Sequence, residues 1–127
     1  MSTFYKLDLR AWPKVRISFN GEPSDAAYDE FIKDLDTLYE SKTNFTILFD
    51  TRNIGKINLK YADKIGKWIK ANRENAKKYL TKTSILITNP ATRLFVKMVI
   101  RISPPASPLE ICGTLRDCVK YLGWLEI

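Results

Sequence analysis

The sequence contains no histidine, and this absence limits the chemistry that its side chains could perform. Histidine is the usual general base near neutral pH and the commonest metal ligand in proteins. Serine–histidine and cysteine–histidine nucleophilic sites are therefore excluded, and Cys112 and Cys118 are too few for a zinc site of four thiolates. We expect a protein that is not an enzyme, with no catalytic residues, no metal and no cofactor.

Asp50 and the two cysteines are the remaining candidates for chemistry, and each also has a structural interpretation. Asp50 ends an apolar run, where a carboxylate more often anchors a loop than takes part in catalysis. Cys112 and Cys118 have apolar neighbours, which raise the pKa of a thiol and favour packed thiols over a reactive pair. Two cysteines make no disulfide framework, and no apolar signal-peptide core follows Met1, so we expect a cytoplasmic protein.

Basic and polar residues after Asp50 predict an anion-binding site. Arg52, Lys56 and Lys60 flank the expected start of a helix at Asn58. The free N–H groups and the dipole at a helix N-terminus favour a negative charge, and open α/β sheets bind ligands beyond the carboxyl ends of their strands. The predicted ligand or anion site therefore consists of Arg52, Lys56, Asn58 and Lys60. The alternative is an ordinary helix start that Asn58 caps.

A second candidate surface lies on the helix that we expect from Ala91 to about Ile102. Apolar residues surround most of this helix, and three cations spaced four apart leave one narrow basic stripe. In the functional interpretation, the apolar excess covers a lipid chain, a membrane or a second subunit. In the alternative, this is a core helix whose three cations lie at the solvent edge. The predicted partner or lipid surface consists of Arg93, Leu94, Lys97, Met98 and Arg101.

The stretch Phe45–Asp50 is the expected centre of the fold. Its apolar and β-branched residues run without a break, which is typical of a strand covered on both faces. Hydrophobic periodicity, N-cap residues and proline positions predict the other elements. We expect strands over Tyr5–Ala11, Val15–Phe19, Phe45–Asp50, Ser84–Thr88 and Leu109–Cys112, and helices over Ser24–Tyr39, Asn58–Tyr79 and Ala91–Ile102 and after Thr114.

The expected order is β-β-α-β-α-β-α-β-α, in a single domain over residues 1–127. Strands separated by helices of these lengths must be parallel, with right-handed crossovers, whereas the N-terminal hairpin adds an antiparallel strand. The sequence therefore predicts an α/β fold with a mixed, mostly parallel sheet of 4–5 strands and helices packed against it. No apolar run approaches the roughly 20 residues that span a bilayer.

The order of elements, the central strand ending in Ile47-Leu48-Phe49-Asp50 and the long helix after it resemble the STAS domain, the fold of bacterial anti-sigma-factor antagonists. The third helix, which leads through Ser103-Pro104-Pro105 to a short strand and a helix ending near Trp124, is more similar to the lipid-binding-like branch. The resemblance implies a non-catalytic regulatory or ligand-binding module. In the classical antagonists a kinase phosphorylates a serine at the start of the helix after the central strand. The matching stretch, Lys56–Lys60, contains no serine or threonine.

The charge pattern indicates an anionic partner. The net charge is +7, and Lys and Arg far outnumber acids between Arg52 and Arg101, whereas acids dominate between Glu22 and Glu40. This separation of basic and acidic segments suits binding to an acidic protein or to an anionic membrane surface. Lysines that only solvate an exposed helix would give the same pattern. Trp68 and Tyr79 fall on the inner face of their expected helix and do not alternate with the lysines, which argues against nucleic acid.

These observations predict a regulatory or interaction module that docks a protein partner or forms a homodimer. The alternative is a small carrier that binds a lipid or an apolar anionic ligand under the helix Ala91–Ile102.

Overall fold

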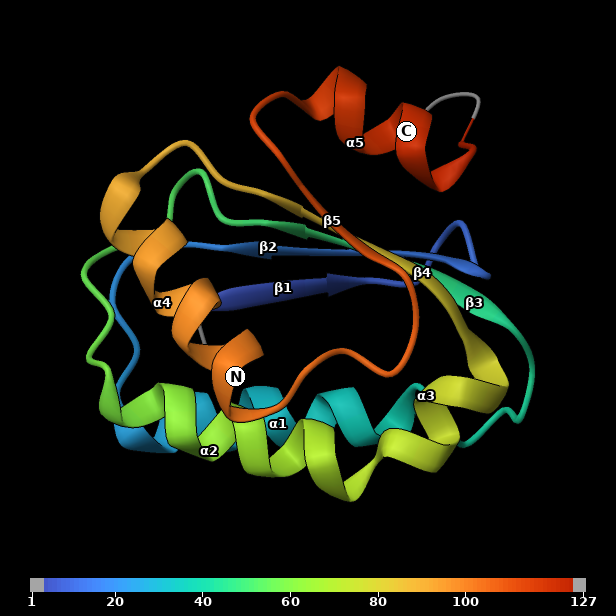
Figure 1. The fold of residues 1–127 in the computed structure, drawn as a ribbon, viewed down its shortest axis with the longest axis horizontal. Coiled ribbons are helices and arrows are strands. Elements are labelled where there is room, and N and C mark those ends of the chain that lie inside the picture. The colour runs from blue at the N-terminus through green and yellow to red at the C-terminus, as the bar shows by residue number, and fades with distance from the viewer. Residues whose placement is uncertain (1–3, 125–127) are drawn as a thin grey trace.

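The computed structural model describes residues 4–124, and within them a sheet of five strands is covered by five helices (Figure 1). The predicted α/β class and the order of strands and helices are confirmed, apart from one helix that is divided in two. The predicted domain, 1–127, includes residues 1–3 and 125–127, which lie outside the described part. The elements are β1 (Tyr5–Asp8), β2 (Lys14–Phe19), α1 (Asp25–Thr37), β3 (Phe45–Asp50), α2 (Lys60–Ala71), α3 (Arg73–Tyr79), β4 (Leu80–Leu86), α4 (Pro90–Ile102), β5 (Leu109–Cys112) and α5 (Leu115–Leu122).

The sheet has the strand order β1-β2-β3-β4-β5. β1 pairs with β2 in antiparallel fashion, and the other neighbouring strands are parallel. β3 is therefore the central strand, and its residues Phe45, Ile47, Leu48 and Asp50 are buried. This agrees with the prediction that the stretch Phe45–Asp50 lies inside the molecule with cover on both faces.

The helices cover the two faces of the sheet unequally (Figure 1). Helices α1 to α4 lie on one face, which we call the four-helix face, and Phe45 and Ile47 of β3 belong to its core. Helix α5 lies on the other, which we call the α5 face, where Leu48, Leu86 and Cys118 pack together. The side chains of β3 alternate between these faces, as a strand requires.

The prediction of one helix from Asn58 to Tyr79 is wrong, because the structure has α2 from Lys60 to Ala71 and a separate α3 from Arg73 to Tyr79. Asn72 lies between them with φ −105° and ψ 16°. Its Nδ2 donates a hydrogen bond to the carbonyl oxygen of Trp68 at 3.0 Å. Asparagine side chains compete with backbone N–H groups for carbonyl oxygens of the preceding turn. The bond from Asn72 to Trp68 is of this kind, and it lies at the point where the helix breaks.

The boundaries of two strands also differ from the prediction. β1 ends at Asp8 and not at Ala11, because Asp8 Oδ1 accepts the N–H of Arg10 at 3.0 Å and the chain turns there. β4 runs from Leu80 to Leu86 and not from Ser84 to Thr88. Thr81 and Lys82 are exposed and polar, so the apolar pattern does not reveal this first part of the strand.

A row of polar contacts joins α1 to α2. Lys60 Nζ lies 3.1 Å from Asp25 Oδ1, and Lys64 pairs with Asp29 one turn further along. Trp68 Nε1 donates to Asp36 Oδ1 at 2.5 Å. Acids of the Glu22–Glu40 segment and lysines of the basic segment therefore partly neutralise each other across this contact. No helix among the described residues is both long and apolar enough to cross a membrane.

Candidate functional site

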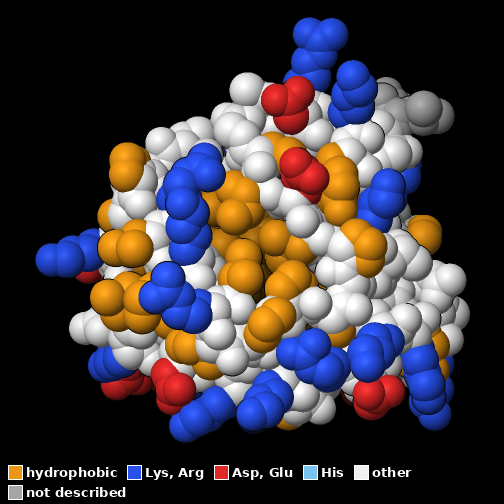
Figure 2. Space-filling view, viewed as in Figure 1, with side chains coloured by type: hydrophobic (Ala, Val, Ile, Leu, Met, Phe, Trp, Pro, Cys, Tyr) orange, Lys and Arg blue, Asp and Glu red, His pale blue; other side chains and the backbone are white. Residues whose placement is uncertain are grey.

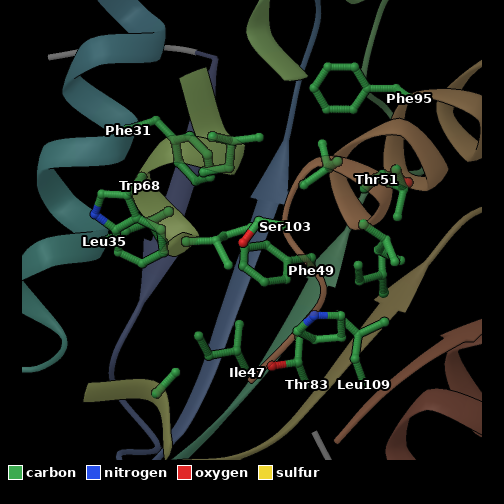
Figure 3. Close-up of a pocket in the computed structure, with 18 of the residues that line it drawn as sticks. Phe31, Leu35, Ile47, Phe49, Thr51, Trp68, Thr83, Phe95, Ser103 and Leu109 are labelled. Atoms are coloured by element: carbon green, nitrogen blue, oxygen red, sulfur yellow. The ribbon is translucent and has the colours of Figure 1, made fainter. Parts of the chain in front are cut away.

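An apolar cavity of about 190 Å³ lies between the four-helix face of the sheet and the helices above it. Figure 3 shows Phe31, Leu35 and Trp68 from the helices around it, together with Ile47 and Phe49 from β3. In the space-filling view, a hollow lined by hydrophobic side chains opens near the centre of the molecule (Figure 2). Helix α4 contributes Phe95, Val96, Val99 and Ile100 to the lining, and β4 contributes Leu80, Thr83 and Ile85.

The lining of the cavity contains no Lys, Arg, Asp or Glu in the described part of the chain. Its polar members are threonine, serine and asparagine side chains together with tyrosines. Thr51 Oγ1 donates to the carbonyl oxygen of Leu86 at 2.6 Å. Thr83 and Thr92 are only 5% and 4% exposed, respectively. The cavity is therefore a neutral, mostly hydrocarbon environment with a few hydroxyl groups.

Contacts between the helices keep the space open. α2 packs closely against α4 at Gly66, where an added Cβ atom would lie only 2.7 Å from Cγ2 of Ile102. The polar row between α1 and α2 fixes the other helix pair. These helices thus hold one another in place, and they do not collapse onto the sheet below.

The segment between α4 and β5 borders the cavity. Pro105, Ala106 and Ser107 line it. Arg73, at the start of α3, donates from Nη2 to Ser103 Oγ at 3.2 Å and to the carbonyl oxygen of Pro104 at 2.9 Å. This part of the border is therefore fixed to α3.

The predicted partner or lipid surface lies on the outer face of α4, opposite the residues that line the cavity. Leu94 is 57% exposed, Met98 is half-buried, and the three cations are exposed. None of these cations forms an ion pair or side-chain hydrogen bond within residues 4–124. The structure thus brings Arg93, Leu94, Lys97, Met98 and Arg101 together on one helix, and their binding role stays a prediction.

The predicted anion site is less well supported by its surroundings. Arg52 is paired with Asp50 at 2.7 Å and Lys60 with Asp25 at 3.1 Å, so both cations already have carboxylate partners. The side-chain oxygen of Asn58 accepts the N–H of Lys60 at 2.9 Å, which satisfies one of the donors at the start of α2. Lys56 is exposed. Anion binding here stays a prediction, in which the bound anion would compete with Asp50 and Asp25.

Asp50 anchors the end of β3. Its Oδ2 accepts from Nη2 of Arg16 at 2.9 Å and from Nη2 of Arg52 at 2.7 Å, and its Oδ1 accepts the N–H of Arg52 at 3.1 Å. Burial alone would raise the pKa of Asp50, but the hydrogen bonds from Arg52 and Arg16 outweigh it and lower the pKa to about 2. The carboxylate stays ionised and fully engaged, as a loop anchor requires.

Cys112 ends β5 and Cys118 lies on the inner side of α5, and both are free, buried thiols. Ser84 Oγ lies 3.6 Å from Sγ of Cys112. Burial raises the pKa of Cys118 to about 11, so this thiol is protonated at neutral pH and is a poor nucleophile. The interpretation of both side chains as packed thiols fits this environment.

The residues that line the cavity were not identified from the sequence, although the carrier alternative placed a ligand under the helix Ala91–Ile102. Thr83 and Thr92 carried the available signal, since each places a hydroxyl at an inner position of an otherwise apolar strand or helix. A buried polar group without a partner is costly, so such positions indicate either a hydrogen bond or a ligand.

Comparison with solved structures identifies the fold. An uncharacterized protein of the DUF3478 family with a SpoIIAA-like fold, from Shewanella loihica PV-4, superimposes with a TM-score of 0.63 at 15% identity, over 96% of this chain and 98% of that one. The anti-sigma factor antagonist SpoIIAA in its unphosphorylated form gives a TM-score of 0.64 at 13% identity, over 94% of this chain and 97% of that one. No protein-family model and no curated protein matches the sequence. This chain has the SpoIIAA-like fold, as its resemblance to the STAS domain implied.

Proposed function

We propose that this protein is a non-catalytic regulatory module that binds a protein partner through the outer face of α4. The observation that carries the proposal is the exposed Leu94 between cations that have no acidic partner within residues 4–124. Exposed apolar side chains beside unpaired charges are typical of binding surfaces, where the charges select the partner and the apolar group adds affinity. An acidic protein segment with an apolar side chain fits this surface.

The fold and the composition support the same proposal. One solved protein with this fold is an anti-sigma factor antagonist, a regulatory protein. The absence of histidine removes the commonest general base, and Asp50, which is buried, is occupied by Arg16 and Arg52. We also propose a cytoplasmic location, where the buried thiols of Cys112 and Cys118 would stay reduced.

Affinity capture with matched surface variants tests this proposal. The bait proteins are wild type, the double variant Leu94→Ser/Lys97→Glu on α4, and Lys70→Glu as a control on the exposed face of α2. We expect one protein to be retained by wild type and by Lys70→Glu but lost from the α4 variant. Retention by all three baits would contradict docking on α4.

Self-association is tested with the same variants. Native mass spectrometry over a range of concentrations would show whether a homodimer forms. A dimer that the α4 variant loses would make a second copy the partner, whereas a dimer that persists in this variant would place the contact elsewhere.

A second proposed function is the carriage of an apolar ligand, and the cavity beneath α4 favours it. A cavity of about 190 Å³ with hydrophobic walls is unusual in a tightly packed interior, where voids larger than a water molecule are few. Native mass spectrometry of freshly purified protein tests this function. We expect the protein to carry an added small-molecule mass that organic extraction removes. If no apolar probe binds in the cavity, the carrier function is contradicted.

A further inference from the structure

We infer that the cavity beneath α4 takes a neutral, compact molecule, with one ring or a short chain and a single hydroxyl or carbonyl group, and not a long-chain fatty acid. The inference rests on the second proposed function, that of a carrier, and specifies the chemical class of its ligand. Three properties of the lining support it: its charge, its volume and its unpaired hydroxyl groups.

The charge of the lining excludes an ionised group inside the cavity. No acidic or basic residue of the described chain lines it. An ionised carboxylate without a partner is expensive to transfer from water to an apolar environment, by several kcal/mol even after relaxation. The cations of α4 lie on its exposed outer face, and Arg73 at the border already donates to Ser103 and Pro104, so none of them offers a free partner within the cavity. The enclosed part of a ligand must therefore be neutral.

The volume limits the size of the ligand. An apolar cavity of about 150 Å³ in a protein interior binds a molecule the size of benzene. The cavity here, about 190 Å³, is only moderately larger. It has room for one ring with one or two small substituents, and a long acyl chain would extend well beyond it.

Two threonine hydroxyl groups supply polarity at opposite sides of the cavity, in addition to the hydroxyl groups of Tyr28, Tyr39 and Ser107, which also line it. Thr83 on β4 and Thr92 on α4 both line the cavity and are at least nine-tenths buried. Neither side chain forms a hydrogen bond with the described chain, whereas Thr51 and Ser103 each do. Every fully buried side-chain oxygen or nitrogen among the described residues has a hydrogen-bond partner. The two threonine hydroxyls have no such partner within the described chain, so they are not fully buried and remain accessible from the cavity.

These hydroxyls determine which polar group the ligand carries. A threonine hydroxyl donates one hydrogen bond and accepts others, so it matches a hydroxyl or a carbonyl group equally well. Figure 3 shows Thr83 beside Ile47 and Leu109, close to the sheet. Thr92 belongs to α4, the helix that covers the cavity. A small ring between them would place its polar atom toward one threonine and its carbon atoms against the aromatic and aliphatic walls.

Titration of the full chain with four probes, followed by amide NMR shifts, tests the inference. The probes are 4-methylphenol, p-xylene, 4-methylbenzoate and palmitate; the first two have the same shape and differ by one hydroxyl. We expect 4-methylphenol and p-xylene to shift the amides of residues that line the cavity. The affinity of 4-methylbenzoate should be weaker by at least about tenfold, because its carboxylate must lose water without gaining a partner.

Valine variants test the role of the hydroxyls, because valine keeps the shape of threonine. Thr83→Val and Thr92→Val are compared with Thr88→Val, whose side chain is exposed outside the cavity. At least one cavity variant should reduce the affinity for 4-methylphenol relative to p-xylene by about 2- to 10-fold, the value of one neutral hydrogen bond. Equal losses for both probes in both variants would overturn the assigned role of the hydroxyls. Urea denaturation of each variant confirms that it is folded.

The outcomes separate this inference from the carrier function. If palmitate binds in the cavity and the two neutral ring probes do not, the inference is overturned and the carrier function stands. If none of the four probes enters the cavity, both are overturned. If the neutral rings bind and palmitate does not, both are supported.

Discussion

The two faces of the sheet are packed in different ways. On the α5 face, Leu48, Leu86 and Cys118 are completely buried, and Trp124 Nε1 donates to Thr46 Oγ1 at 2.8 Å. On the four-helix face, a cavity of about 190 Å³ lies within the core that the helices form with the strands. One short helix covers the α5 face, whereas the helices of the four-helix face leave a cavity that opens at the surface of the molecule (Figure 2).

The difference shows where the helices obtain their contacts. α5 packs directly on β4 and β5. On the four-helix face, α2 contacts α4 at Gly66, and α1 is joined to α2 through Lys60–Asp25 and neighbouring pairs. Contacts among these helices replace part of the contact with the sheet. The α5 face thus serves only to pack the fold, whereas the four-helix face both packs the fold and has room for a ligand.

Adjacent residues of β4 provide the largest expected contrast between the faces. Leu86 is fully buried on the α5 face, and Ile85 lines the cavity. We expect Leu86→Ala to lower the free energy of unfolding by about 3–4 kcal/mol, and Ile85→Ala by less than about 2 kcal/mol, because truncation beside an existing space removes fewer contacts. Urea denaturation of both variants measures the difference. Equal losses would show that the two faces are equally well packed.

Acid should weaken the anchor at the end of β3. The pKa of Asp50 is lowered to about 2, so its stabilisation is complete above its unfolded pKa of about 4 and is lost as the pH falls through 2. We expect a contribution of about 2 kcal/mol over this range. Urea denaturation between pH 6 and pH 2 measures it, with Asp50→Asn as the control. The stability difference between wild type and this variant should shrink as the pH falls. A constant difference would contradict the role of the ionised carboxylate.

A phenylalanine introduced on each face tests whether there is free space. Cys118→Phe should lower the free energy of unfolding by at least about 1 kcal/mol, because the site under α5 is full. Val99→Phe points a larger side chain toward the cavity and should change the stability by less than about 1 kcal/mol. The Val99 variant should also lose binding of 4-methylphenol. Thermal denaturation and the NMR titration check both effects. A large destabilisation by Val99→Phe would show that the cavity has no free space for the larger side chain.

The smallest expected effect concerns the contact between α1 and α2. Trp68→Phe removes the hydrogen bond from Nε1 to Asp36 but keeps an aromatic ring next to the cavity. We expect a loss of about 0.5–1 kcal/mol, since this bond is exposed to solvent. Urea denaturation measures the loss, and hydrogen exchange should show faster opening of α1 and α2 with no change under α5. Faster exchange under α5 as well would mean that the two faces open together.

Local signals were sufficient to predict most of the fold. The unbroken run Phe45–Asp50 identified the central strand, and the caps at Ser24 and Thr114 located two helix starts, each with the expected side-chain hydrogen bond. Pro90 located a third helix start, where the structure adds a cap by Asn89. The break at Asn72 could not be predicted, because an asparagine at that position is also compatible with a continuous helix. The early start of β4 was hidden by the polar Thr81 and Lys82.

The site was less predictable than the fold, for physical reasons. Whether inward-facing residues fill a core or surround a space depends on the separation between helices, and that separation arises from contacts such as Gly66 with Ile102. The pairing of Lys60 with Asp25 likewise joins segments far apart in the chain. The exposed stripe on α4 was accessible to sequence reasoning, since it depends only on helical spacing.

A crystal structure of the protein under xenon pressure tests the central claim most directly, because xenon enters apolar cavities without needing a specific ligand. We predict xenon between α4 and the sheet, in contact with Phe49 and Ile85, and none under α5. Absence of xenon from the four-helix face, or equal occupancy beneath α5, would contradict the claim that only one face of the sheet is built to hold a ligand.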